Sequence, residues 1–375
     1  MTNDKIVIFG LTTQGYALAS EIVANGQDVY VIDESAASAI LIDADILKNY
    51  PTVSSLKEDE PILSLIPTDI ALSTAEYLFF GPRIRKTGSD IKTDITSKFK
   101  DTTLKIKSGC SVVYTLPTGL GGNNENISLL EHITGFAVGK KINYFYYPLG
   151  TDEFDYIGAF GGEQNKKLDK LLKTKKNKKF VNISSSELIH AINILSRFSK
   201  LTGLLEVCKF ATEKTSKSDL MLNKFSELYL DDMISDLFDL RSLSTSFEGS
   251  TNLVALSNSC LKSIDGYIKR LIDEIRLILK KNELKASRTK ILLSWSLDQH
   301  DMKGDKNEML ENIILKLRDY IGDVDAVEGD VDLFNTDKTT LVIACSKYDY
   351  EKLKGSAKDD DRILIKANPI FETIK

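Results

Sequence analysis

The sequence predicts an α/β protein with an N-terminal parallel-sheet domain, a central helical domain with a long helix, and a smaller C-terminal α/β domain. Two observations predict this arrangement. Short apolar strands alternate with amphipathic helices at both ends of the chain, whereas the middle has helical periodicity alone. A length of 375 residues allows two or three domains. We place the boundaries at 1–183, 184–285 and 286–375.

The first βαβ unit begins close to the start of the chain. Lys5–Phe9 is a short apolar strand, and Gly10–Gly15 is the turn that follows it. Tyr16–Asn25 has the apolar spacing of a helix, and Gly26 ends that helix. Asp28–Asp33 is the second strand, so a right-handed crossover should place the two strands parallel in one sheet.

The alternation of strands and helices continues through the N-terminal domain. Asn126–Phe136 is typical of a helix, and Lys166–Lys179 combines leucines at helical spacing with many lysines. We interpret this lysine-rich stretch as a solvated outer helix and a basic loop. The alternative is a patch that contacts an anionic partner. The further strands expected here are Tyr77–Phe80, Ser111–Thr115, Asn143–Tyr147 and Ile157–Gly162, the last with its turn.

From residue 184 onward the pattern changes to helix after helix. Ser184–Ser186 has N-cap chemistry, and Glu187–Lys214 is a long amphipathic helix. Further helices are expected over Met221–Leu240 and Leu253–Lys281. A strand and helix alternation then returns, with strands at Lys290–Trp295, Leu341–Cys345 and Arg362–Lys366 and helices at Lys306–Ile321 and Tyr350–Lys354.

Apolar residues surround the long helix more broadly than one buried face requires. This breadth is expected if the helix packs against a second subunit as well as its own domain. Burial inside one chain would give the same pattern. The residues concerned are Leu195, Phe198, Leu201, Leu204 and Leu205.

Composition excludes several classes of protein. The formal net charge is -5, with 42% hydrophobic and 27% charged residues, so neither nucleic acid nor an anionic membrane is indicated as a partner. No apolar run is long enough to span a bilayer, and the N-terminus lacks an apolar signal segment, which favours a cytoplasmic protein. The four cysteines contain no CxxC pair and the three histidines are dispersed, so we expect no metal site.

The turn after the first strand carries the clearest chemical signal. The dinucleotide fingerprint is GxGxxG, and here Gly10 and Gly15 are present while Thr12 takes the middle place. The Thr12 side chain should crowd a pyrophosphate, although its hydroxyl could donate to a phosphate oxygen. Asp33 could accept a hydrogen bond from a ribose hydroxyl, which favours NAD over NADP. The alternative is a Rossmann-like turn retained for folding only.

Several segments resemble the UDP-glucose/GDP-mannose dehydrogenase family, which oxidises nucleotide sugars to uronic acids with NAD. Asp59–Leu65 is similar to its D-E-P-G-L-x-x-L motif, and Ala71–Phe80 to its next helix end and strand. Tyr114–Gly119 resembles its S-T-V-x-P-G turn near the nicotinamide. Glu187–Glu206 resembles its long central helix, and Lys290–Leu297 the start of its sugar-binding domain.

The resemblance implies a Rossmann-like first domain, a homodimer formed through the central helices, a nucleotide sugar as ligand and a place in polysaccharide biosynthesis. It also implies that NAD would lie against the first domain. The positions that match the family's cofactor contacts are Gly10, Thr12, Gly15, Asp33, Pro82 and Thr115.

The catalytic positions depart from the family pattern. The family's nucleophilic cysteine lies in a G-G-x-C-I-P segment, and its counterpart Glu248–Thr251 places Thr251 where the thiol should be. Cys260, nine residues later, is the candidate for a displaced nucleophile; a small apolar filler is the alternative. The family's lysine on the central helix corresponds to His190, which could carry a proton or be structural.

Other departures add to these. The family's S-P-E segment becomes Tyr147–Leu149, and its sugar-recognising F-K…D-x-R run becomes Leu297–Asp305. Removing a catalytic nucleophile costs several powers of ten in rate. We therefore expect a degenerate family member that binds a nucleotide or nucleotide sugar without oxidising it. Two alternatives remain: a single hydride transfer with His190 as base, and a structural protein that uses Lys166–Lys179 to bind a partner.

Overall fold

The computed structural model describes residues 5–59, 62–86, 90–150, 156–173, 178–214, 223–327, 339–355 and 362–374. The chain divides into two compact units. Unit 1 comprises Met1–Ile194, Ser242–Glu248 and Asp298–Gly304, and unit 2 comprises Leu195–Arg241, Gly249–Leu297 and Asp305–Lys375. The division into domains at 1–183, 184–285 and 286–375 stays a prediction. None of the helices in the described ranges is long and apolar enough to cross a membrane.

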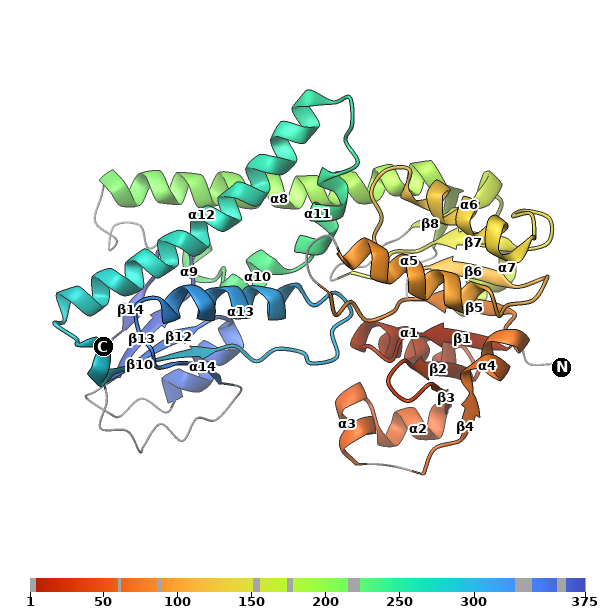
Figure 1. Cartoon of the computed structure of the whole chain (residues 1–375), viewed down its shortest axis with the longest axis horizontal. Helices are drawn as coiled ribbons and strands as arrows, with labels where there is room; N and C mark the ends of the chain where they lie inside the picture. Colours follow the sequence, from red (N-terminus) through yellow and green to blue (C-terminus); the bar gives the residue numbers. More distant parts are fainter. Residues whose placement is uncertain are drawn as a thin grey trace. The chain divides into compact units, whose positions relative to one another are not determined.

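Unit 1 is built on a sheet of nine strands within the described residues, in the order β4-β3-β2-β1-β5-β6-β7-β8-β9 (Figure 1). Its centre is parallel, because β1 pairs with both β2 and β5, and β6 and β7 follow in the same direction. The strands are β1 (Ile6–Phe9), β2 (Val29–Asp33), β3 (Ser38–Ile42), β4 (Leu65–Pro67), β5 (Tyr77–Phe80), β6 (Ser111–Tyr114), β7 (Asn143–Tyr146), β8 (Tyr156–Ala159) and β9 (Lys179–Asn182).

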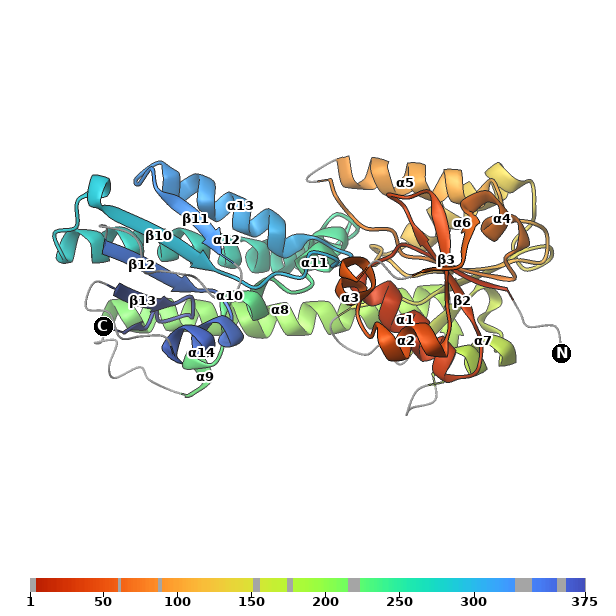
Figure 2. The ribbon, with the colours of Figure 1, turned by 90° about the horizontal axis from the view of Figure 1, so that it is seen from below.

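Helices cover both faces of this sheet. Figure 2 shows α4, α5 and α6 on one face and α1, α2 and α7 on the other. The sheet interior is apolar on both sides, as expected of parallel strands covered by helices; Ile6, Val29 and Phe79 are fully buried. The helices are α1 (Thr13–Ala24), α2 (Ala44–Asn49), α3 (Val53–Glu58), α4 (Thr68–Thr74), α5 (Asp90–Thr103), α6 (Gly122–Thr134) and α7 (Lys166–Leu171).

Unit 2 holds a second sheet, with the strand order β11-β10-β12-β13-β14 in the described residues. Its first four strands are parallel, and α13 and α14 lie on opposite faces (Figure 2). The strands are β10 (Thr289–Ser294), β11 (Val324–Val327), β12 (Thr339–Ala344), β13 (Arg362–Lys366) and β14 (Thr373–Ile374). The helices in or entering this unit are α8 (Ile183–Lys214), α9 (Asn223–Ser226), α10 (Leu230–Ile234), α11 (Leu237–Ser244), α12 (Thr251–Lys281), α13 (Asp305–Arg318) and α14 (Lys347–Gly355).

The predicted fold class is confirmed: a large, mainly parallel sheet, long helices and a smaller sheet are all present. Two local expectations were wrong. The long helix α8 begins at Ile183, and its first turn is capped by Asn182, whose side chain accepts a hydrogen bond from the Ser185 N–H at 2.7 Å, not by the serine run. Asp236, with a φ of 59°, interrupts the helical stretch predicted up to Leu240.

The lysine-rich stretch is partly confirmed. α7 (Lys166–Leu171) forms the predicted outer helix, with Leu168 and Leu171 buried against unit 1. Residues 174–177 of the predicted basic loop lie outside the described residues. A partner for this stretch stays a prediction.

Candidate functional site

The turn after β1 needs its two glycines for steric reasons. Gly10 has a φ of +122°, and a Cβ there would lie 2.2 Å from the carbonyl oxygen of Gly81. A Cβ on Gly15 would lie 2.5 Å from the Gly10 carbonyl oxygen. The first glycine therefore permits the tight turn, and the last lets α1 pack closely against it.

Thr12, at the middle position of the motif, caps the start of α1 and does not point into solvent. It is the N-cap of α1, and its hydroxyl oxygen accepts a hydrogen bond from the Gly15 N–H at 3.0 Å. Its side chain is fully buried, and its own N–H donates to the Gly10 carbonyl at 3.0 Å. The side chain that should crowd a pyrophosphate is thus turned inward to start the helix.

The strand order of unit 1 reverses between β1 and β5, because the chain adds β2 on one side of β1 and later β5 on the other. Open α/β sheets bind ligands outside the carboxyl ends of strands at such a switch point. The turns after β1 and β5 flank this place, which we call the first crevice. A remote segment of the same unit, Asp298–Gly304, lies across both turns.

Backbone hydrogen bonds hold this segment to both turns. The Thr13 N–H, at the start of α1, donates to the carbonyl oxygen of His300 at 2.9 Å. On the other side, the Ile84 N–H donates to the carbonyl oxygen of Met302 at 2.8 Å. Met302 is fully buried, and its sulfur lies 3.4 Å from the place a Cβ on Gly81 would take.

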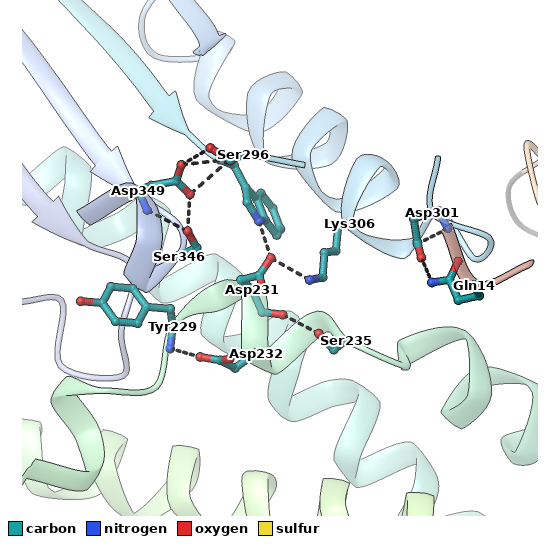
Figure 3. A network of polar contacts seen from close by, with 12 residues as sticks. Gln14, Tyr229, Asp231, Asp232, Ser235, Ser296, Asp301, Lys306, Ser346 and Asp349 are labelled. Carbon is teal, nitrogen blue, oxygen red and sulfur yellow. Dashed lines mark hydrogen bonds and ion pairs between the residues drawn. The ribbon is translucent and has the colours of Figure 1, made fainter. Parts of the chain in front are cut away.

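Gln14 adds two side-chain bonds to the same segment. Its Nε2 donates to Asp301 Oδ1 at 2.5 Å, as Figure 3 shows, and its Oε1 accepts from the Met302 N–H at 2.9 Å. The second oxygen of Asp301 accepts from the Gly304 N–H at 3.0 Å. The first crevice is therefore filled by the protein's own residues.

Asp33, the predicted ribose acceptor, ends β2 at the edge of the same crevice. One carboxylate oxygen accepts from the Ser35 N–H at 2.8 Å, and the other lies 3.4 Å from Lys57 Nζ. The imidazole of His300 is close to both charges. Its pKa is lowered chiefly by burial and by Lys57, while Asp298 and Asp33 act to raise it.

Pro82 and Thr115 complete the predicted cofactor residues, and both are buried. The Thr115 hydroxyl donates to the Phe80 carbonyl at 2.8 Å and lies 2.5 Å from the place of a Cβ on Gly81. The structure brings all six predicted cofactor residues to the carboxyl edge of one sheet. The roles of these residues in binding NAD stay predictions.

Glu187, near the start of α8, is a polar residue of unit 1 that the sequence reasoning used only as a helix start. It is buried, and its carboxylate accepts from the N–H groups of Gly121 and Asn123 at 2.9 and 3.0 Å and from Asn123 Nδ2 at 2.8 Å. These amides open α6, so Glu187 occupies a helix N-terminus that could hold an anion. The sequence did contain a signal for this role, because Glu187 is an acidic residue on an otherwise apolar face of α8.

The three candidate catalytic residues are not gathered by either unit. His190 lies in the unit 1 part of α8 and is buried. Thr251 is the exposed first residue of α12 in unit 2, and Cys260 lies on the same helix with its side chain fully buried. Nine residues of helix separate Thr251 and Cys260 by about 13 Å along the axis. Their roles stay predictions.

Unit 2 has its own switch point, between β10 and β12. We call the place outside the carboxyl ends of these two strands the second crevice. Helix α10 (Leu230–Ile234) is packed there: the N–H groups of Leu230 and Asp231 donate to the carbonyls of Ala367 and Cys345, at 2.8 and 3.0 Å. Asp231 Oδ1 accepts from Trp295 Nε1 and lies 2.8 Å from Lys306 Nζ, the latter pair visible in Figure 3.

A second carboxylate holds the loops at this edge. Asp349 is buried and accepts from the N–H and hydroxyl of Ser296, at 3.1 and 2.6 Å, and from the hydroxyl of Ser346 (Figure 3). Ser296 follows β10 and Ser346 follows β12, so Asp349 ties together the two strand ends. Asp231 and Asp349 therefore accept hydrogen bonds from the polar groups that follow β10 and β12.

No family model matches this sequence, and no curated protein does. The structure, in contrast, is similar to solved dehydrogenases. UDP-glucose dehydrogenase from Pyrobaculum islandicum matches with a TM-score of 0.66 and 13% identity, covering 97% of this chain and 94% of that one. UDP-D-ManNAc dehydrogenase from Pyrococcus horikoshii matches with 0.64 and 14%, covering 91% and 88%. UDP-N-acetyl-mannosamine dehydrogenase from Staphylococcus aureus matches with 0.54 and 12%, covering 92% and 88%.

The chain has the fold of nucleotide-sugar dehydrogenases. At these identities the likeness concerns the fold alone, and function must be argued from the residues. The dehydrogenase fold explains why two parallel sheets with two switch points occur in one chain.

The turn at the first crevice has the glycines of a diphosphate site, but the backbone N–H of Thr13 at the start of α1 is already hydrogen-bonded. The glycine turn allows a close approach, yet the Thr13 N–H is bonded to His300 and the Gln14 side chain to Asp301 and Met302. A diphosphate needs such an amide at the start of the helix. With the segment in place, these residues do not fit the diphosphate of NAD.

Proposed function

We propose that this chain is a nucleotide-sugar dehydrogenase-like protein that does not carry out the two-step, NAD-dependent oxidation. The observation that supports this most is the state of the thiols: all four cysteines of the chain, Cys110, Cys208, Cys260 and Cys345, are buried. Oxidation through a thioester needs an accessible thiolate.

The environment of the thiols supports the same proposal. Burial, helped by Glu76, raises the pKa of Cys110 to about 12. Burial also raises the pKa of Cys208, and it raises that of Cys345 well above its usual value, with Asp349 adding to it. A protonated, enclosed thiol is a poor nucleophile, so these cysteines are better explained as core residues.

The proposed role is to bind a nucleotide or nucleotide sugar without oxidising it, in the cytoplasm, as a homodimer formed through the central helices. The unit 2 part of α8 supports a dimer in one respect: Val207 and Phe210 are 61% and 63% exposed. Phe198 and Leu205, which the sequence offered for the same interface, are instead buried within their own unit.

Two measurements test the proposal. Purified protein mixed with NAD and either UDP-glucose or UDP-N-acetylmannosamine should form no NADH, whereas stoichiometric NADH would overturn it. A thermal shift with the same sugar nucleotides should raise the melting midpoint, because a ligand that binds only the folded state stabilises it. NADH formed at one equivalent per sugar rather than two would favour the single hydride transfer.

A thiol-labelling experiment tests the observation beneath the proposal. The native protein should resist a small maleimide until denaturant is added. A Thr251→Cys variant is the matched control, because position 251 is exposed at the start of α12 and a thiol placed there should react at once. Rapid labelling of the native wild-type chain would contradict the burial of its thiols.

A further inference from the structure

The segment Asp298–Met302 places negatively charged side chains near the N-terminus of α1, a position that favours anions. It contains two carboxylates, Asp298 and Asp301, and its carbonyl at His300 receives the N–H of Thr13. The start of a helix favours negative charge and oxygen acceptors through its unpaired amides and its dipole. The segment therefore supplies, from within the chain, the acceptors that a diphosphate would supply.

The charge of Arg83, a cation of the same unit, is influenced by the same two carboxylates. Burial and the neighbouring Arg85 lower the pKa of Arg83, whereas Asp298, Asp301 and Glu34 act to raise it. Arg83 lies in the turn that follows β5, three residues after Phe80. An arginine at this position could pair with phosphate oxygens, and here it is neighboured by carboxylates instead.

The fold of the segment on itself fits this role. The His300 N–H donates to Asp298 Oδ1 at 2.8 Å, and the Asp301 N–H donates to the Asp298 carbonyl at 3.2 Å. This tight turn presents the His300 carbonyl to α1 and the Asp301 carboxylate to Gln14. Hydrogen bonds join the segment to both turns, and the buried Met302 side chain adds an apolar contact near Gly81.

We propose that Asp298–Met302 is an internal occupant of the first crevice which mimics a diphosphate, so that NAD binds only when this segment is displaced. The contact is autoinhibitory: the segment and the cofactor's diphosphate compete for the Thr13 N–H. The inference goes beyond the proposed function, since it concerns binding in unit 1 and not oxidation.

Calorimetric titration with NAD tests the competition. Wild-type chain should bind NAD weakly. Asp301→Asn should bind it about tenfold more tightly, because the segment loses one of its two carboxylate charges and Asp301 loses one of its two acceptor oxygens. Gln14→Met keeps a side chain of similar length but removes the bonds of Gln14 to Asp301 and Met302. It should also tighten NAD binding. Asp273→Asn is the charge-matched control in unit 2, where Asp273 is paired with Arg276, and should leave NAD binding unchanged.

Hydrogen exchange distinguishes two cases: NAD displaces the segment Asp298–Met302, or NAD binds while the segment stays in place. The Ile84 N–H is held by the Met302 carbonyl and the Met302 N–H by Gln14. Saturating NAD should speed exchange at both amides, while the Thr13 amide stays protected by its new acceptor. Full protection at Ile84 and Met302 with NAD bound would overturn the inference, as would equal affinity in wild type and both variants or no binding in any of them. Tight NAD binding by wild type with the segment in place would also overturn it, yet would leave the proposed function standing.

Discussion

The two sheets of this protein close their switch points in different ways. In unit 1 the first crevice is covered by Asp298–Gly304, which reaches the turns mainly through hydrogen bonds at a part-buried edge. In unit 2 the second crevice is filled by α10, whose Leu230, Met233 and Ile234 are fully buried.

This difference in closure indicates which of the two crevices could still admit a ligand. Breaking a few partly solvated hydrogen bonds costs little, because water replaces the partners. Removing α10 would expose apolar side chains and leave the Trp295 indole N–H without its acceptor Asp231, which costs far more. We therefore expect the first closure to be reversible and the second to be part of the core.

The largest expected effect is in the second crevice. Trp295→Ala should lower the free energy of unfolding by about 3–5 kcal/mol, since Trp295 is 1% exposed and its removal leaves a cavity beside α10. Urea denaturation measures the loss. Tyr348→Ala, at a position 63% exposed in α14, is the control and should cost little. A loss at Trp295 no greater than at Tyr348 would mean that α10 closes its crevice as loosely as the segment closes the first.

A smaller loss is expected at Glu187 in unit 1. Glu187→Gln should cost about 1–3 kcal/mol, because an amide group cannot accept all the bonds that the carboxylate takes from Gly121 and Asn123. Thermal unfolding of the variant measures it. Glu125→Gln, where the side chain is 67% exposed and paired with Lys92, is the matched control. Equal midpoints for the two variants would show that α6 does not depend on the buried acid.

Thr12 distinguishes a helix cap from a ligand contact in the first crevice. Thr12→Ala should cost about 1 kcal/mol, whereas Thr12→Gly should cost only a few tenths, since glycine is tolerated at an N-cap. Denaturant titration of both variants gives the comparison. If alanine proved as harmless as glycine, the hydrogen bond from the Gly15 N–H would contribute nothing to α1.

The smallest effect is the titration of His300. Its pKa is lowered below 6.5, first by burial and then by Lys57. A histidine whose folded pKa lies below its unfolded value favours folding in its neutral form. That contribution is present above about pH 6.5 and is lost as the pH falls through the lower folded value. The His300 resonance in an NMR titration should therefore move at a lower pH than in urea-unfolded chain, and coincident midpoints would contradict the placement beside Lys57.

Local patterns in the sequence were sufficient for most of the fold. Buried strands such as Tyr77–Phe80 and Arg362–Lys366 were predicted with their observed bounds, because a short apolar run between breakers has one stable arrangement in a parallel sheet. The antiparallel β3 and the edge strand β4 were missed, since such short strands carry a weak pattern. The break at Asp236 was missed because a left-handed φ outside glycine leaves no local signal.

The sequence by itself determined the parallel core of both sheets, the glycine turn and the helix that follows it, since these depend on neighbours in the chain. It also showed that Glu248–Thr251, the segment that resembles the family's nucleophile motif, contains no cysteine. The tertiary structure alone decided what occupies each crevice. Gln14 and Asp301 are 287 positions apart, and Asp231 and Trp295 are 64 apart. No local period records such pairs, because only the packing of whole elements brings them within hydrogen-bonding distance.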